Sequence, residues 1–255
     1  MNNRQIAEKL LLDGFGKGDI DFVKSVVVKD YIQHDPTAPD GLDGLLLFMG
    51  EIGKAPPEQR PIIRRVRTIT DGNMVAMHSD YFWGGKVAAF DVFRLRDGKV
   101  MEHWSAAQPQ PEHTASGHTM LDGPTEIEDA ELTQQNKALI KNFFEQVIIG
   151  GNFAAMPEFF DGDKYIQHSP MIADGVSGLQ KGFAAAAAAG AEIRYNEVKY
   201  MLGEGNMVLT MGRGTIGGKH SVFFDLFRIA KGKIAEHWDV VQEIPAESKN
   251  LNGML

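Results

Sequence analysis

Aspartate side chains that could carry acid/base chemistry occur on predicted strands with apolar neighbours. In the segment Phe224–Ile229, period-two alternation places Asp225 on the same face as Phe227. A carboxylate on an apolar face is costly unless it is hydrogen-bonded or protonated, so its pKa should rise. A raised pKa is how proteins tune a general acid or base. The alternative is that Asp225 is tied to a backbone N–H group or a buried histidine and only holds the sheet together.

The last predicted strand carries two further groups of the same kind. His237 and Asp239 are two positions apart, so both side chains point to one face of the strand, and Trp238 points to the other. A histidine in this setting could equally be a packed core residue, with Trp238 filling the opposite face of the sheet. The catalytic residues that we predict are His168, Asp225, His237 and Asp239.

Most of these residues have a partner 134 positions earlier in the chain. Tyr31-Ile32-Gln33-His34 returns as Tyr165-Ile166-Gln167-His168, and the Glu-His-Trp triplet around His237 also occurs around His103. Ser105 stands where the second copy has Asp239, so copy one has lost the base if Asp239 is that base. The ligand-binding residues that we predict are His34, Asp91, His103, Tyr165 and Trp238.

Other chemistries have weaker support in the sequence. Two histidines and one or two carboxylates could ligate zinc or iron, but no HxxxH or HxH pair places two ligands on one element. The chain contains no Gly-x-Ser-x-Gly elbow, no P-loop and no strand followed by Gly-x-Gly-x-x-Gly. We therefore expect no metal and no cofactor.

The 134-residue repeat indicates that these 255 residues form two domains. Each copy of about 120 residues is close to the common domain size and can bury its own core. We predict one domain over residues 1–121, a linker over 122–134 and a second domain over 135–255.

Composition narrows the class of partner. The hydrophobic content of 43% and charged content of 24% are those of a soluble globular protein. The net charge of −8 argues against binding to nucleic acid or an anionic membrane. The chain has no cysteine, no apolar signal core at its N-terminus and no apolar run of membrane-spanning length. We expect a cytoplasmic protein that binds a small molecule.

Each copy reads as helices followed by strands. Apolar residues at helical spacing, such as Ile6 and Leu10, give way to period-two segments separated by Gly-containing turns. This order predicts an α+β fold with helices on one face of a curved antiparallel sheet. The predicted strands are 62–70, 74–82, 87–95 and 99–107 in copy one, and 193–202, 207–213, 221–229 and 233–241 in copy two.

Together, the Tyr-Ile-Gln-His-x-Pro, Asp-x-Phe-Arg and Glu-His-Trp segments resemble the SnoaL-like polyketide cyclase family of the NTF2-like superfamily. The resemblance implies two tandem cone-shaped barrels, each a curved antiparallel sheet wrapped by about three helices around an apolar pocket. It also implies chemistry without a cofactor or metal, and an acid/base residue at the position of Asp239. Ser105 departs from that pattern in copy one. Because family members commonly pair their sheets, we expect an internal pseudo-dimer of the two copies.

The functional prediction is acid/base catalysis by copy two on a small apolar carbonyl compound, as in an aldol-type cyclase or an isomerase. Asp239 or Asp225 would take a proton from the carbon next to the carbonyl, and His168 and His237 would orient that base or stabilise the enolate. One alternative is a non-catalytic small-molecule-binding protein in which copy one is a scaffold. Another is a module that binds a protein partner.

Overall fold

The computed structural model describes all 255 residues and divides them into two compact units. Unit 1 consists of Met1–Pro109 together with Pro245–Leu255, and unit 2 consists of Gln110–Ile244. The predicted boundaries at residues 121 and 135 therefore differ from those of the units. The segment that follows the last strand of each copy belongs to the other unit.

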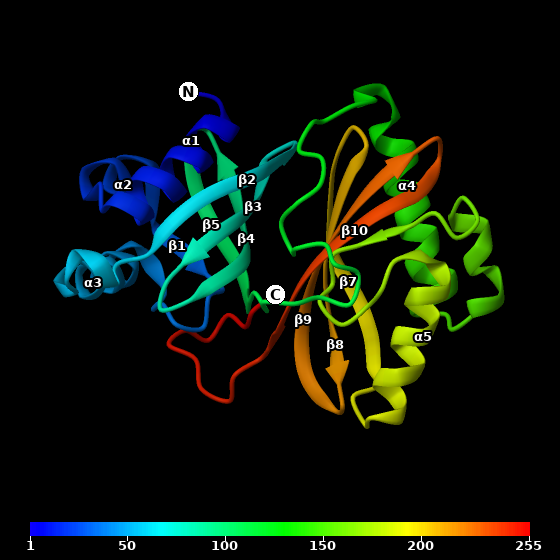
Figure 1. Cartoon of the computed structure of the whole chain (residues 1–255). Coiled ribbons are helices and arrows are strands. Elements are labelled where there is room, and N and C mark those ends of the chain that lie inside the picture. The colour runs from blue at the N-terminus through cyan, green and yellow to red at the C-terminus, as the bar shows by residue number, and fades with distance from the viewer. The chain divides into compact units, whose positions relative to one another are not determined.

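Unit 1 runs from helices into strands, as its hydrophobic pattern predicts (Figure 1). Asn2 begins the first helix because its side chain accepts a hydrogen bond from the backbone of Gln5. The helical segments are α1 (Asn3–Lys9), a π-helical turn (Leu10–Phe15), α2 (Ile20–Val26), α3 (Gly41–Lys54) and a 3₁₀ turn (Pro57–Gln59). The strands are β1 (Val27–Gln33), β2 (Ile62–Asp71), β3 (Met74–Phe82), β4 (Lys86–Arg96) and β5 (Lys99–Pro109).

The sheet of unit 1 has the order β1-β5-β4-β3-β2. Four strands form the antiparallel meander that the sequence predicts, and β1 adds a fifth strand that runs parallel to β5. The Tyr-Ile-Gln segment is thus a strand, with Gln33 next to His103 in the ladder. The sheet is mixed, where a purely antiparallel one was expected.

Unit 2 repeats this topology, with its sheet in the order β6-β10-β9-β8-β7 and β6 parallel to β10. In Figure 1, α4 and α5 lie on the same side of this sheet. The helical segments are a 3₁₀ turn (Ala130–Leu132), α4 (Thr133–Phe143), a π-helical turn (Phe144–Ile148), a 3₁₀ segment (Phe153–Phe159) and α5 (Gly175–Ala188). The strands are β6 (Ile166–Gln167), β7 (Ile193–Glu204), β8 (Met207–Ile216), β9 (Lys219–Ala230) and β10 (Lys233–Glu243).

A core in each unit joins the helices to one face of its sheet. In unit 1, Leu10 and Leu11 from the helical side and Phe93 from β4 are fully buried in one cluster. Full burial of such a side chain contributes about 1.5–3 kcal/mol relative to exposure. The two units therefore match the predicted tandem α+β architecture. In each unit, the core holds the residues on the inner face of the sheet in place.

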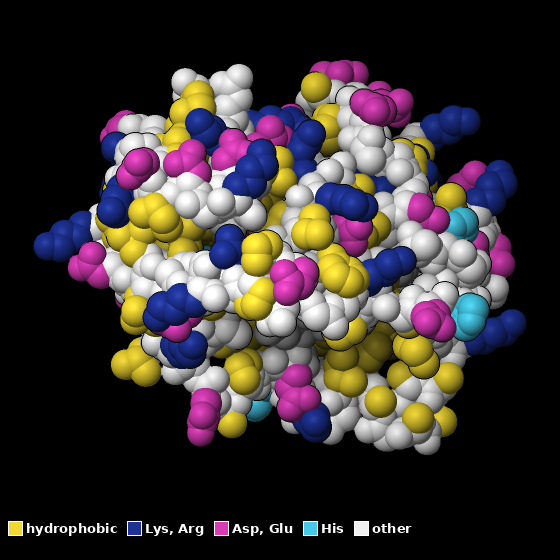
Figure 2. Space-filling model, turned by 60° about the vertical axis from the view of Figure 1, so that its left-hand side comes forward, with side chains coloured by type: hydrophobic (Ala, Val, Ile, Leu, Met, Phe, Trp, Pro, Cys, Tyr) yellow, Lys and Arg dark blue, Asp and Glu magenta, His cyan; other side chains and the backbone are white.

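The surface carries charges of both signs. Acidic and basic side chains are interspersed over the face shown in Figure 2. No helix is long and apolar enough to cross a lipid bilayer.

Candidate functional site

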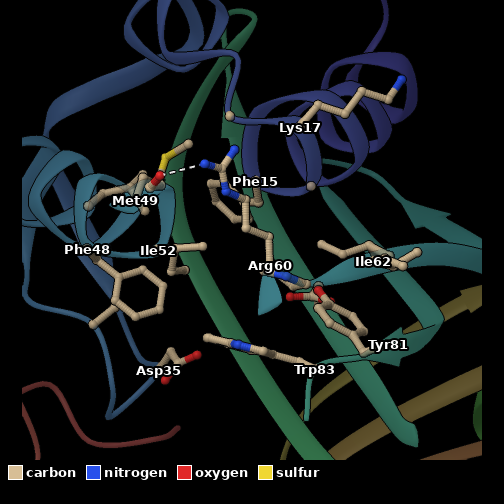
Figure 3. Close-up of a pocket in the computed structure, with 18 of the residues that line it drawn as sticks. Phe15, Lys17, Asp35, Phe48, Met49, Ile52, Arg60, Ile62, Tyr81 and Trp83 are labelled. Carbon is tan, nitrogen blue, oxygen red and sulfur yellow. Dashed lines mark hydrogen bonds between the residues drawn. The ribbon is translucent and has the colours of Figure 1, made fainter. Parts of the chain in front are cut away.

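Unit 1 contains a cavity of about 350 Å³ that is lined by the π-helical turn, α3, the strands β1 to β5 and the loops beside them (Figure 3). Pockets that enclose small molecules begin at about 300 Å³ and are mostly apolar, with a few polar groups. The apolar lining residues are Phe15, Ala38, Leu45, Phe48, Met49, Ile52, Pro57, Pro61, Ile62, Ile63, Tyr81 and Trp83.

A chain of hydrogen bonds forms one polar part of this cavity wall. The Tyr81 hydroxyl donates to Asp91 Oδ2 at 2.8 Å, and His103 Nε2 lies 3.1 Å from Asp91 Oδ1. His103 Nδ1 lies 3.0 Å from Gln33 Oε1. An amide oxygen can only accept, so Nδ1 carries the hydrogen of this bond. Asp91 and His103, both predicted as ligand-binding residues, are thus brought together at the cavity.

Burial fixes the protonation state of the tyrosine. It raises the pKa of Tyr81 well above its ordinary value, and the nearby Asp91 carboxylate raises that pKa further. The phenol therefore remains an O–H donor across the physiological pH range.

Asp35 supplies a second carboxylate to the cavity wall of unit 1. Its Oδ2 accepts a hydrogen bond from the Ser105 hydroxyl at 3.0 Å. Its Oδ1 accepts from the backbone N–H and the hydroxyl of Thr37, at 2.8 and 2.7 Å. These donors hold the carboxylate in one orientation. The first copy therefore has a carboxylate next to Ser105, at the position where the sequence suggested that it had lost one.

The two units carry this carboxylate–hydroxyl pair in opposite order. In unit 2, Asp239 is the acid, and the Ser169 side chain is close enough to lower the pKa of Asp239. In unit 1, the residue matching Ser169 is Asp35, and the residue matching Asp239 is Ser105. The carboxylate is on the last strand in unit 2 and on the loop after β1 in unit 1, and a serine is its neighbour in both units.

Unit 2 repeats the Gln–His–Asp part of this hydrogen-bonded chain around Asp225, but its tyrosine comes from β7, at the position that matches Pro61. Asp225 Oδ1 accepts from the Tyr195 hydroxyl at 2.9 Å and lies 3.1 Å from His237 Nε2. His237 Nδ1 lies 2.9 Å from Gln167 Oε1. The predicted residues Asp225 and His237 therefore meet in the structure, and Asp239 is the neighbour of Asp225 across β9 and β10.

The cavity at this chain in unit 2 is only about 40 Å³. Phe144 and Phe183 line it, whereas unit 1 has Leu10 and Met49 at the matching positions. The predicted binding residue Tyr165 also lines it, and its hydroxyl is 3.1 Å from Gln167 Nε2. This space has room for about one water molecule.

Asp239 itself is buried and does not line that small cavity. Burial raises the pKa of Asp239; His237 opposes the rise, and the negative charge of Asp225 adds to it. Unit 2 therefore holds a carboxylate with a raised pKa, on Asp239. A cavity of about 260 Å³ in unit 2 is lined by Phe183 and Tyr195 but not by Asp225, His237 or Asp239. The cavity that has an aspartate and a histidine in its wall and room for a ligand is in unit 1.

The predicted residues His168 and Trp238 lie on the opposite face of the unit 2 sheet. His168 stacks on Trp238 with ring centres 4.7 Å apart, and its Nε2 lies 2.9 Å from Glu236 Oε1. Burial opposes ionisation of Glu236, but hydrogen bonds from His168 and Arg228 lower its pKa below the ordinary value. Neither His168 nor Trp238 lines a cavity at the Asp225 chain.

The predicted binding residue His34 has the same place in unit 1. It stacks on Trp104, and its Nε2 lies 2.8 Å from Glu102 Oε1. Strand alternation explains this, because Gln33 points to the cavity and the next residue must point to the other face. The structure thus does not bring His34 or His168 to the cavity, and both serve the packing of the outer face.

Sequence reasoning missed Gln33, Asp35 and Tyr81. Had β1 been assigned as a strand, its alternation would have placed Gln33 beside His103. The Asp-for-Ser difference at position 35, opposite in sense to the one at Ser105, was a signal for the relocated acid. No pattern in the sequence pointed to Tyr81.

One group of side chains could be considered for a metal ion. Ligand atoms of Asp225, His237 and Asp239 lie within 4.8 Å of one another, and all three residues are buried. Both ring nitrogens of His237 already have hydrogen-bond partners, so a cation would have to replace the bond to Asp225. The residues therefore fit a metal only after rearrangement.

Comparison with known proteins finds a family to which the first copy is similar. Residues 9–103 match the family described as SnoaL-like domain. Unit 1 is therefore similar to a SnoaL-like domain. The match covers β1 to β4 and the start of β5, including the Asp91 and His103 positions of this SnoaL-like unit. Unit 2 repeats its strand order and its hydrogen-bonded chain, consistent with a tandem NTF2-like fold.

Solved structures with similarity to the chain each cover about one unit. IdmH from Streptomyces antibioticus, named as a candidate polyketide cyclase, shares 18% identity over 42% of this chain and 93% of its own, with a TM-score of 0.37. An NTF2-like protein of unknown function from Cytophaga hutchinsonii shares 13% identity over 43% and 92%, with a TM-score of 0.36. A Xanthomonas campestris protein with a cystatin-like fold shares 23% over 42% and 91%, with a TM-score of 0.37. No curated protein matches the chain.

Proposed function

We propose that unit 1 binds a small, mostly apolar carbonyl compound and catalyses proton transfer at the carbon next to the carbonyl. The observation that carries this proposal is the cavity of about 350 Å³ with Asp35 and the Tyr81–Asp91–His103 chain in its wall. An apolar cavity with a few polar groups is the common form of a small-molecule site.

In this proposal Asp35 is the proton acceptor. Ser105 and Thr37 fix its carboxylate, so little reorganisation is needed when a C–H bond is presented to it. The proton moves to the carboxylate, and the electron pair of the C–H bond moves toward the carbonyl oxygen to give an enolate. Return of the proton to another carbon gives an isomer, and attack of the enolate carbon on a second carbonyl gives an aldol.

The Tyr81 hydroxyl can hold the carbonyl oxygen once its single hydrogen turns from Asp91 Oδ2 to the ligand. Burial and Asp91 keep the hydroxyl protonated, and a donor placed where negative charge develops stabilises an enolate. Asp91 is a positioning residue in this scheme, because its Oδ2 accepts from Tyr81 while His103 holds its Oδ1. Unit 2, with about 40 Å³ at its matching chain, acts as a scaffold.

Deuterium exchange at the carbon next to the carbonyl of 2-tetralone tests this proposal, with NMR detection in D₂O. The wild-type protein should accelerate exchange, and Asp35→Asn should lower the acceleration by about 100-fold or more, as loss of a general base does. Asp239→Asn is the matched control in unit 2 and should leave the exchange rate unchanged. Equal rates for wild type and Asp35→Asn would refute the role of Asp35.

A second candidate function is binding without catalysis. It is favoured by the finding that both carboxylate oxygens of Asp91 and both ring nitrogens of His103 already have partners within the protein. Trp83 reports binding by its fluorescence, because it lines the cavity and is 48% exposed while the other two tryptophans, Trp104 and Trp238, are fully buried. If 2-tetralone changes this fluorescence but its deuterium exchange is not accelerated, binding without catalysis is the function.

A further inference from the structure

The loop from His34 to Asp40, which carries Asp35, lies against the C-terminal segment of the chain. Asn250 is 5% exposed, and its Nδ2 donates to the carbonyl oxygens of Asp35 at 2.7 Å and Ala38 at 3.1 Å. Both hydrogens of that amide are thus used on one loop. Asp35 and Ala38 both line the cavity of unit 1.

Asn252 holds the two ends of the same loop. Its Nδ2 donates to the carbonyl oxygen of Gln33 at 2.9 Å and to Asp40 Oδ1 at 2.8 Å. Asp40 Oδ1 also accepts from the backbone N–H of Gln33 at 2.8 Å, so this carboxylate closes the loop. The C-terminal segment therefore fixes the backbone on both sides of Asp35.

Backbone contacts continue the same pattern. The N–H of Lys249 donates to the carbonyl oxygen of Pro36 at 2.8 Å, and the carbonyl oxygen of Gly253 lies 2.7 Å from His34 Nδ1. Met254 and Leu255 are buried at the end of the segment. The segment is packed along its length, although Leu251 is fully exposed.

The segment after β5 makes matching contacts in unit 2. The N–H of Ala115 donates to the carbonyl oxygen of Pro170 at 2.8 Å, and the carbonyl oxygen of Thr119 lies 2.7 Å from His168 Nδ1. His118 takes the place of Asn252, with its Nε2 3.2 Å from Asp174 Oδ2. The residues in each of these contacts are 134 positions before or after the residues that make the matching contact in unit 1. The segment after the last strand of each copy therefore packs in the same way on the other unit.

We propose that the segment Pro245–Leu255, which continues from the last strand of unit 2, holds the Asp35 loop of unit 1 in its ligand-binding conformation, with Asn250 and Asn252 as positioning residues. The chain order requires this segment to come from the other copy. Changes at the end of copy two therefore act on the cavity of copy one. This inference rests on the proposed function only for its effect on ligand binding.

Hydrogen exchange of backbone amides tests the contact without any ligand. Asn250→Asp combined with Asn252→Asp keeps the shape of both side chains but replaces each donating amide group with a carboxylate oxygen, which can only accept. In the full chain this variant should speed exchange in residues 33–41 by about tenfold or more, with no change in residues 167–175. His118→Ala is the matched control and should speed exchange in residues 167–175 only. If the double variant unfolds, Asn252→Ala alone serves as the milder test.

Unchanged exchange in residues 33–41 of the asparagine variants would overturn the inference. For the link to binding, 2-tetralone titrated against Trp83 fluorescence should show an affinity at least about fivefold weaker in the double variant and unchanged in His118→Ala. Where deuterium exchange of the ketone is measurable, its KM should rise more than its kcat falls. If wild type binds no 2-tetralone, the proposed function fails while amide exchange still decides the role of the segment.

Discussion

Replacement of Ser105 by aspartate would place two carboxylates side by side in the cavity of unit 1. Ser105 Oγ lies 3.0 Å from Asp35 Oδ2. Two unit charges about 4 Å apart repel by about 4 kcal/mol at an effective dielectric constant of about 20. Uptake of a proton by one carboxyl limits this cost, so we expect Ser105→Asp to lower the free energy of unfolding by about 2–4 kcal/mol at pH 8.

The pH dependence has a definite sign. Repulsion raises the pKa of one member of the new pair in the folded state above its value in the unfolded chain, so the folded protein binds the proton more tightly. The loss of stability should therefore be small at pH 4, where that carboxyl is protonated, and should grow as pH rises through the raised pKa.

A second substitution provides the control. Adding Asp35→Ser to Ser105→Asp reproduces the order found in unit 2, where Ser169 and Asp239 form the pair. The double variant should regain stability to within about 1 kcal/mol of wild type, and urea unfolding of all four proteins gives the coupling energy. A cost below about 0.5 kcal/mol for Ser105→Asp at pH 8, or strictly additive effects, would refute the pairing of positions 35 and 105.

Two other substitutions test the cavity and the buried acid. Met49→Phe introduces the larger side chain that unit 2 has at Phe183 and should weaken 2-tetralone binding by about tenfold or more through overpacking. The control substitution Phe183→Met in unit 2 should not weaken binding. Equal affinities of wild type and Met49→Phe for 2-tetralone would contradict the assignment of the cavity. Burial raises the pKa of Asp239, so the charge on its carboxylate destabilises the folded protein as pH rises through that pKa. Asp239→Asn should therefore raise Tm at pH 8 but not at pH 4. A constant Tm difference between the two proteins across this pH range would contradict the raised pKa.

The order of helices and strands could be predicted from the sequence because its periodicity is strong. The segments around Phe93 and Phe227 alternate clearly, and both are strands with the predicted aspartate facing inward. The parallel strand at the Tyr-Ile-Gln segment could not be read in this way, since β6 has only two residues and its partner is about 70 positions away. Such pairing depends on tertiary contacts.

The candidate site was only half accessible from sequence. Alternation placed Asp91 and His103 on their strands, and the structure brings them together. Asp35 lies on a loop, where no period reports the direction of a side chain. The size of a cavity depends on how particular side chains pack, as Met49 and Phe183 illustrate. The sequence could not predict that the segments after β5 and β10 each pack on the other unit. Both copies end in the same motif, so the sequence pattern does not say which unit each segment contacts.

The central claim is that the ligand site is in unit 1 and has Asp35 in its wall. A crystal structure of the protein soaked with 2-tetralone tests it most directly. We expect electron density for the ketone between α3 and the strands of unit 1, with its oxygen within hydrogen-bond reach of Tyr81 and its reactive carbon next to Asp35. Density at Asp239 in unit 2, with the unit 1 cavity holding only water, would contradict it.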